Sequence, residues 1–212
     1  MARLVRKTIC SEVWEGNGIL ALKRYEPAIH RLREEGGDVD SEWVWGFKRF
    51  GKCAEEVALL FEALALREGC GRIVAVPPSK PEDQPTELQK LFGMEIERTR
   101  QVEYRKWRHG TPLAVDYEES YTVAVMPKCH ILLVDDVCTT GTVLGHFADR
   151  LRREGHEVLC ACVGLANRVE AKRVGFLAVF EKKPEPLTTE DAWIRQLLES
   201  ASRDELSIAM ER

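Results

Sequence analysis

One stretch limits the possible folds of this chain more than any other, residues 131–144, which read Ile-Leu-Leu-Val-Asp-Asp-Val-Cys-Thr-Thr-Gly-Thr-Val-Leu. Its apolar beginning, His130–Val134, predicts a fully buried strand of a parallel sheet. A helix is predicted directly after the turn by apolar residues at helical spacing: Val143, Leu144, Phe147 and Leu151. A buried strand, a tight turn and a helix in this order indicate an α/β fold.

The turn between this strand and this helix has the chemistry of a phosphate site. Thr139–Thr142 combines three hydroxyl groups and one glycine at a helix N-terminus, where free backbone N–H groups attract anions. Asp135 and Asp136, expected where the strand ends, would repel a phosphate. Their carboxylates suit sugar hydroxyls, or water held by a metal ion. Each part alone is common at strand ends without a ligand, but the combination predicts a phosphorylated sugar.

The same residues resemble the phosphoribosyl pyrophosphate (PRPP) signature of type I phosphoribosyltransferases, with a nearly unbroken match over 132–142. The resemblance implies an open, mostly parallel sheet flanked by helices, with Asp135 and Asp136 holding the ribose hydroxyls. The PRPP-binding residues that it implies here are Asp135, Asp136, Val137, Cys138, Thr139, Thr140, Gly141 and Thr142. It also implies Mg²⁺, held mainly by the oxygens of PRPP and approached by the two aspartates.

The order of segments is similar to the ComF-like branch of this superfamily. An aromatic and basic segment from Trp43 precedes an amphipathic helix over 52–67 and a strand over 72–76 that ends in Val-Pro. Gly164–Arg168, after the signature, corresponds to another segment of that branch. Two departures are plain: the branch's zinc module is absent, and Lys80–Gln84 replaces its usual Arg-Gly-Phe-Asn-Gln segment.

Two further segments are candidates for contact with pyrophosphate. The first, the loop Pro77–Pro81, follows a predicted strand at its carboxyl end, where open α/β sheets bind ligands; an ordinary strand-ending loop is the alternative. The resemblance assigns Pro78, Ser79 and Lys80 to PRPP, with Lys80 as a catalytic cation.

The second segment, Arg98–His109, is basic and contains Tyr104 and Trp107. The resemblance implies a mobile lid whose basic residues, from Arg98 to Arg108, meet the pyrophosphate, with Arg105 and Arg108 as catalytic cations. A solvated helix surface and binding of single-stranded nucleic acid are the alternatives, and the last is the least favoured.

The rest of the chain predicts a smaller N-terminal element and a larger domain. Residues 1–42 are expected to form an accessory hairpin (8–23), a helix (27–35) and a polar connector (38–41), a candidate hood over the base. Residues 43–212 are expected to form the phosphoribosyltransferase-like domain. Within it we expect a further helix over 86–92, strands over 158–165 and 175–181, and a C-terminal helix over 188–198 that opens at a capping box.

Composition excludes several classes of protein. With 31 basic and 35 acidic residues the net charge is −4, which favours neither nucleic acid nor an anionic membrane. No apolar run approaches the roughly 18 residues that a membrane span needs, and no apolar signal core follows Met1, so a cytoplasmic protein is expected. The seven cysteines are expected to be reduced and packed in the core; Cys160 and Cys162, alternating on one strand, lack further metal ligands nearby.

The predicted function is transfer of the 5-phosphoribosyl group from PRPP to a nucleobase or another nitrogen nucleophile, with release of pyrophosphate. A sensor that binds PRPP or a nucleotide without turnover is the second hypothesis, and a nucleic-acid-associated protein the third. Thr139 stands where relatives that use 6-oxopurines carry an aspartate, so little transfer to hypoxanthine or guanine is expected. The sequence leaves the oligomeric state open, a homodimer included.

Overall fold

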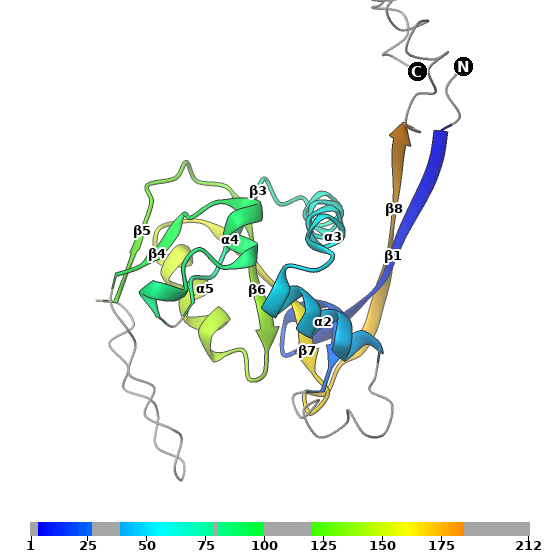
Figure 1. Cartoon of the computed structure of the whole chain (residues 1–212). Helices are drawn as coiled ribbons and strands as arrows, with labels where there is room; N and C mark the ends of the chain where they lie inside the picture. Colours follow the sequence, from blue (N-terminus) through cyan, green and yellow to red (C-terminus); the bar gives the residue numbers. More distant parts are fainter. Residues whose placement is uncertain (1–3, 27–38, 79, 100–119, 185–212) are drawn as a thin grey trace, which may run out of the picture. The chain divides into compact units, whose positions relative to one another are not determined.

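The computed structural model describes residues 4–26, 39–78, 80–99 and 120–184 (Figure 1). Contacts within the chain define two units, Cys10–Val179 and a second one made of Met1–Ile9 with Phe180–Arg212. All described residues of the candidate site belong to Cys10–Val179.

A six-stranded mixed sheet, with the strand order β3-β6-β7-β2-β1-β8, organises the fold. Its strands are β1 (Leu4–Gly16), β2 (Ile19–Tyr25), β3 (Arg72–Ala75), β6 (His130–Cys138), β7 (Glu157–Ala166) and β8 (Lys172–Pro184). β3, β6, β7 and β2 are parallel neighbours, and β1 pairs antiparallel with β2. The prediction of an α/β protein with a mostly parallel sheet is therefore confirmed.

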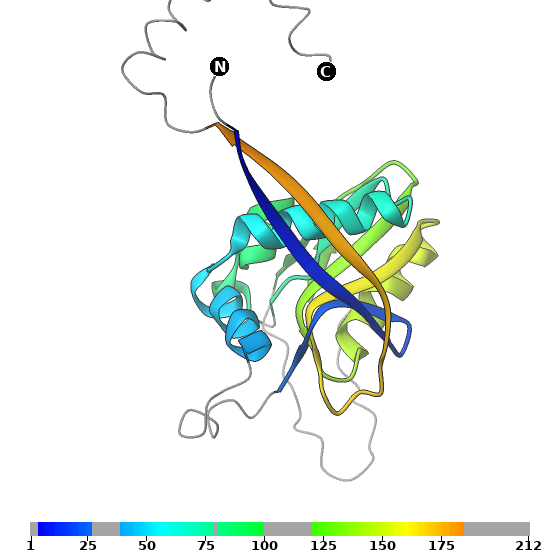
Figure 2. The same ribbon diagram turned by 90° about the vertical axis from the view of Figure 1, so that its right-hand side faces the viewer.

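Helices flank this sheet, with α5 and α3 on opposite sides of β6 in Figure 1. The helices are α2 (Val39–Phe50), α3 (Ala54–Arg67), α4 (Glu87–Phe92) and α5 (Thr142–Arg153). α5 packs on β6 and β7, α4 on β3 and β6, and α2 on β2, β6 and β7. Figure 2 shows β1 (dark blue) and β8 (orange) side by side, as the strand order of the sheet requires.

The core follows the predicted apolar pattern. Ile131–Val134 of β6 are fully buried, as a strand with neighbours on both sides and helices on both faces requires. On α3 the predicted buried face is confirmed at Val57, Leu60, Phe61 and Leu64. On α5 the buried residues are Leu144, Phe147, Ala148 and Leu151, whereas Val143 is half-buried.

The predicted N-terminal hairpin forms, and its second strand joins the main sheet. Asn17 and Gly18 turn the chain with φ values of 55° and 72°, a conformation that asparagine and glycine adopt most readily. β2 then runs parallel to β7, with Ile19 opposite Cys160 and Tyr25 opposite Ala166. The proposed division of the chain at residue 42 stays a prediction.

Several local predictions were wrong or incomplete. The connector predicted over 38–41 is wrong, because α2 already begins at Val39, with Asp40 and Glu42 in its first turn near the positive end of the helix dipole. Two short antiparallel strands, β4 (Ile96–Arg98) and β5 (Tyr121–Val123), have no counterpart among the predicted elements.

Other predictions have a plainer outcome. β8 is longer than the predicted strand 175–181. The predicted helices 27–35 and 188–198 lie outside the described residues. None of the described helices is long and apolar enough to cross a membrane.

Candidate functional site

β6 does not end at Val134, as the sequence suggested, but continues through the acidic pair to Cys138. On one side its neighbour β7 also continues, so Asp135 pairs with Cys162 and Val137 with Gly164. On the other side β3 ends at Ala75, whose partner is Val134. The edge of β6 from Asp135 onward therefore loses its β3 neighbour just where the carboxylates begin.

The two carboxylates are held differently. Asp135 Oδ1 accepts a hydrogen bond from the Asp136 backbone N–H at 2.8 Å, and Asp136 Oδ1 lies 3.0 Å from Lys48 Nζ. Burial and the charge of Asp136 raise the pKa of the Asp135 carboxyl well above its ordinary value. Desolvation disfavours the charge of Lys48, but the attraction of Asp136 and their hydrogen bond outweigh it, so the pKa of Lys48 is raised.

A cavity of about 800 Å³ opens beside these carboxylates. Its walls come from the end of α2, the segment after β3, the start of α4 and the end of β6. The lining residues are Phe47, Lys48, Arg49, Val76, Pro77, Pro78, Asp83, Pro85, Thr86, Glu87, Leu88, Asp135, Asp136, Val137 and Val143. The cavity thus lies beyond the carboxyl ends of β3 and β6, where parallel sheets bind their ligands.

A second, smaller hollow of about 50 Å³ adjoins it at the turn Thr139–Thr142. Asp135, Val137 and Val143 line both spaces. Gly141 is the N-cap of α5 and brings no capping side chain, so this helix start offers backbone N–H groups to a ligand. The turn Thr139–Thr142 and the acidic pair therefore lie side by side, as the sequence predicted, and phosphate binding at this turn stays a prediction.

Gly141 is required at this turn for two reasons. Its φ is +81°, a conformation that L side chains rarely adopt, and a Cβ atom placed there would lie 2.8 Å from Ile19 Cδ1. Ile19 belongs to β2, so the N-terminal hairpin supports the turn. The hydroxyl oxygens of Thr140 and Thr142 lie 3.0 Å apart.

Arg98 holds the segment Pro77–Pro78 after β3, which forms an uncharged part of the cavity wall. This residue is only 3% exposed, and it donates hydrogen bonds to the Pro78 carbonyl at 3.0 Å and to Ser120 Oγ at 2.6 Å. The guanidinium also lies over the rings of Tyr121 and Phe147, at 5.8 and 5.6 Å. Arg98 therefore joins the segment after β3 to α5.

Arg98 does not belong with the pyrophosphate-binding cations among which the sequence placed it, because its charge is buried against protein groups. β4 and β5 pair Arg98 with Tyr121, and the Thr99 N–H donates to the Ser120 carbonyl at 2.9 Å. The two ends of the segment between these strands thus meet beside Pro78. Arg105 and Arg108 of the predicted lid lie outside the described residues.

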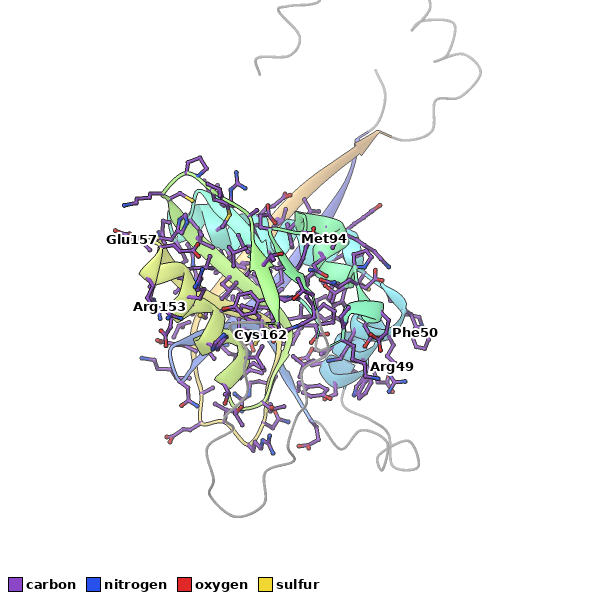
Figure 3. The ribbon with its side chains drawn as sticks, turned by 90° about the vertical axis from the view of Figure 1, so that its left-hand side faces the viewer. Arg49, Phe50, Met94, Arg153, Glu157 and Cys162 are labelled. Carbon is purple, nitrogen blue, oxygen red and sulfur yellow. The ribbon has the colours of Figure 1, made fainter. Side chains whose placement is uncertain are left out.

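The remaining predicted site residues have mixed outcomes. Pro78 lines the cavity together with the acidic pair, whereas Lys80 is exposed and is absent from the described lining. Ser79 lies outside the described residues. Sequence reasoning missed Lys48 and Arg49, although both belong to the aromatic and basic segment that it singled out; α2 brings them to the cavity, and Figure 3 labels Arg49 at the end of this helix.

Cysteines divide between the core and the surface. Cys138, Cys160 and Cys162 are buried as expected, and Figure 3 labels Cys162 on the sheet, but Cys70 and Cys129 are only half-buried and Cys10 and Cys53 are exposed. The described part of the chain contains no group of three or more His, Cys, Asp or Glu side chains that could hold a metal ion by themselves. Asp135 and Asp136 supply carboxylate oxygens beside the cavity, and these suit a hard cation that keeps most of its ligands from elsewhere.

Comparison with known proteins yields neither a matching family model nor a matching curated protein. Function is therefore inferred from the chemistry of the site.

Proposed function

We propose that this protein binds PRPP and transfers its 5-phosphoribosyl group to a nucleobase or another nitrogen nucleophile. The observation that carries the proposal is the pair of adjoining hollows, one at a helix N-terminus and one beside two carboxylates, with Asp135 in the lining of both. An anion fits the first hollow and hydroxyl groups fit the second. A sugar phosphate has both groups on one small molecule.

Each end of the ligand has a partner in this proposal. The 5′-phosphate accepts hydrogen bonds from the backbone N–H and hydroxyl groups of Thr139–Thr142. The ribose hydroxyls donate to Asp135 and Asp136, and such hydrogen bonds to charged groups are worth about 1.5–3 kcal/mol each. The pyrophosphate and the nucleophile then share the larger cavity, whose volume of about 800 Å³ leaves room for both.

Catalysis would come from positioning and electrostatics. As the bond to pyrophosphate breaks, positive charge develops on the sugar, and the nearby carboxylates stabilise it. Holding the nucleophile against C1 of the ribose lowers the entropic cost of the reaction. Asp135 and Asp136 fit the Mg²⁺ that PRPP carries, and this ion would supply neutralisation of the leaving group's charge.

A PRPP-binding or nucleotide-binding sensor is the second candidate, and one observation favours it. Lys80, the predicted catalytic cation after β3, is absent from the described lining, while Asp83 and Glu87 add negative charge to the cavity wall. A leaving pyrophosphate needs cations in its vicinity, whereas a binding site for a sugar monophosphate does not.

The two candidates are separated by incubating the protein with PRPP, Mg²⁺ and a panel of nucleobases, and by measuring pyrophosphate release and nucleoside monophosphate formation. A transferase forms a product with at least one base; 6-oxopurines are expected to be poor acceptors because Thr139 cannot exchange a proton near neutral pH. The control is the double variant Asp135→Asn and Asp136→Asn, in which PRPP should bind at least about tenfold more weakly.

The outcomes of this experiment decide between the candidate functions. Tight PRPP binding without product from any base supports the sensor. Absence of PRPP binding contradicts the transferase and a PRPP sensor. Equal binding of PRPP by the parent and the double variant would mean that the acidic pair does not hold the ribose.

A further inference from the structure

Among the described residues, Lys48 is the one whose charge contacts the acidic pair directly. Its Nζ lies 3.0 Å from Asp136 Oδ1, and it reaches this position from the last turn of α2, far away in sequence. Its side chain is 41% exposed, so it lacks the close packing that fixes Arg98. The pair therefore joins two elements through a contact that a ligand can reach.

The charges around the cavity make this contact unusual. The described lining contains four carboxylates, Asp83, Glu87, Asp135 and Asp136, and two cations, Lys48 and Arg49. Of the carboxylates, Glu87 also pairs with Lys90 at 2.6 Å. Within this lining, a ligand with several negative charges has only Lys48 and Arg49 to offset the carboxylates.

Arg49 and Lys48 are not equally able to move. The Arg49 guanidinium lies over the Trp45 ring at 4.7 Å, a contact within α2 that holds its position. The Lys48 ammonium is a compact point charge on a flexible stem, which can exchange a carboxylate for a phosphate oxygen without loss of geometry. Its contact with Asp136 takes one acceptor position of that carboxylate, for which a ribose hydroxyl would compete.

We propose that Lys48 is a substrate-binding cation that exchanges partners, leaving Asp136 when the ribose hydroxyl arrives and pairing with the pyrophosphate group of the ligand. The inference rests on the proposed function and makes it specific. α2, and not the loop after β3, supplies the cation that the leaving group requires. The ion pair in the ligand-free protein keeps this cation beside the site and neutralises part of the acidic pair until the ligand replaces it.

The exchange is tested with Lys48→Met and Lys48→Arg and two ligands, PRPP and ribose 5-phosphate, each titrated in the presence of Mg²⁺. Both ligands carry the ribose and the 5-phosphate, but only PRPP carries the pyrophosphate. The matched control is Lys23→Met, which also removes a lysine–aspartate bridge to α2, that of Lys23 Nζ with Asp40 Oδ1 at 2.8 Å, outside the cavity.

In Lys48→Met, PRPP affinity should fall about ten- to a hundredfold, the scale of one hydrogen bond between charged groups. Ribose 5-phosphate affinity should remain within about threefold or improve, because no ion pair has to be broken. Lys48→Arg should restore most of the PRPP affinity, and Lys23→Met should leave the affinity for both ligands unchanged.

Two results would overturn the exchange while leaving the proposed function intact. If Lys48→Met weakened the affinity for PRPP and for ribose 5-phosphate equally, Lys48 would only shape the ribose site. Unchanged PRPP affinity in that variant would show that the pyrophosphate has other partners. If the parent protein bound ribose 5-phosphate but not PRPP, the exchange and the proposed transferase would both be wrong.

Discussion

Strands β3 and β6 are parallel neighbours that end at the same cavity, but different forces shape the two ends. After β3 the chain leaves the sheet through Pro77 and Pro78, a wall without charge that the buried Arg98 holds by the Pro78 carbonyl. β6 instead continues through Asp135 and Asp136. The carboxylate of Asp136 forms an ion pair with the partly exposed Lys48.

This difference separates a rigid wall from an adjustable one. Hydrogen bonds of a buried guanidinium to a carbonyl and a hydroxyl persist across pH and salt, because none of these groups titrates near neutrality. A partly exposed ion pair contributes little stability, so a ligand can replace it at low cost. We expect variants on the β3 side to change mainly the free energy of unfolding, and variants on the β6 side to change mainly the affinity for the ligand.

The largest expected effect follows from removing the support of the rigid wall. Arg98→Met should lower the free energy of unfolding by about 2–4 kcal/mol, because the Pro78 carbonyl and Ser120 hydroxyl lose a charged donor in a buried place. Denaturant unfolding measures this. The control is Arg72→Met, which removes an exposed arginine that lies 3.4 Å from Glu95 and should cost less than about 1 kcal/mol.

Arg98→Lys sharpens the comparison. The lysine keeps the charge but not the fork that reaches both oxygens, so only part of the stability should return. Equal stability of Arg98→Met and Arg72→Met would mean that the segment after β3 is rigid without Arg98.

A smaller effect is expected at the turn that follows β6. Gly141→Ala should cost about 1–2 kcal/mol of stability, because alanine is strained at a φ of +81° and its Cβ meets Ile19. Ribose 5-phosphate should also bind more weakly, as calorimetric titration would measure, since the backbone N–H groups of the turn are displaced.

Gly145 offers a matched control four residues further on. It lies inside α5, and a Cβ atom placed there would have no neighbour within 4 Å, so Gly145→Ala should stabilise the helix by about 0.5–1 kcal/mol. If Gly141→Ala lowers the free energy of unfolding and Gly145→Ala raises it, the backbone conformation at Gly141, and not the loss of a glycine as such, accounts for the cost. A stabilised Gly141→Ala protein would contradict this.

The smallest effect concerns the titration of Asp135. Its pKa is higher in the folded protein than in the unfolded chain, so the folded protein holds the proton more tightly. The free energy of unfolding should therefore decrease as pH rises from the ordinary aspartate pKa through the raised one. Solvent screens part of this penalty because Asp135 is only half-buried.

Asp135→Asn removes this titration and keeps an oxygen for the Asp136 N–H. Its stability should match that of the parent protein at low pH and exceed it increasingly toward neutral pH, as denaturant unfolding across a pH series would measure. A constant difference across the series would mean that the Asp135 carboxyl has no raised pKa.

Much of the site could be predicted because its parts are contiguous in sequence. The strand, the acidic pair and the turn lie within 14 residues, from Ile131 to Leu144, so local periodicity and turn chemistry were enough to bring them together. The end of β6 was placed too early, because a strand's length depends on which neighbours continue beside it. β7 runs on past Asp135 while β3 does not, and no local pattern records that difference.

The sequence by itself determined the α/β class, the buried faces of α3 and α5, and the candidate residues for a sugar phosphate, since side-chain chemistry and apolar spacing are local properties. Only the tertiary structure decided which charges meet. It buried Arg98 under the wall after β3, left Lys80 outside the described lining and brought Lys48 to Asp136. The physical reason is that the interaction between two charges depends on their distance in space. The packing of α2 across the sheet sets that distance for two residues that are 88 positions apart in sequence.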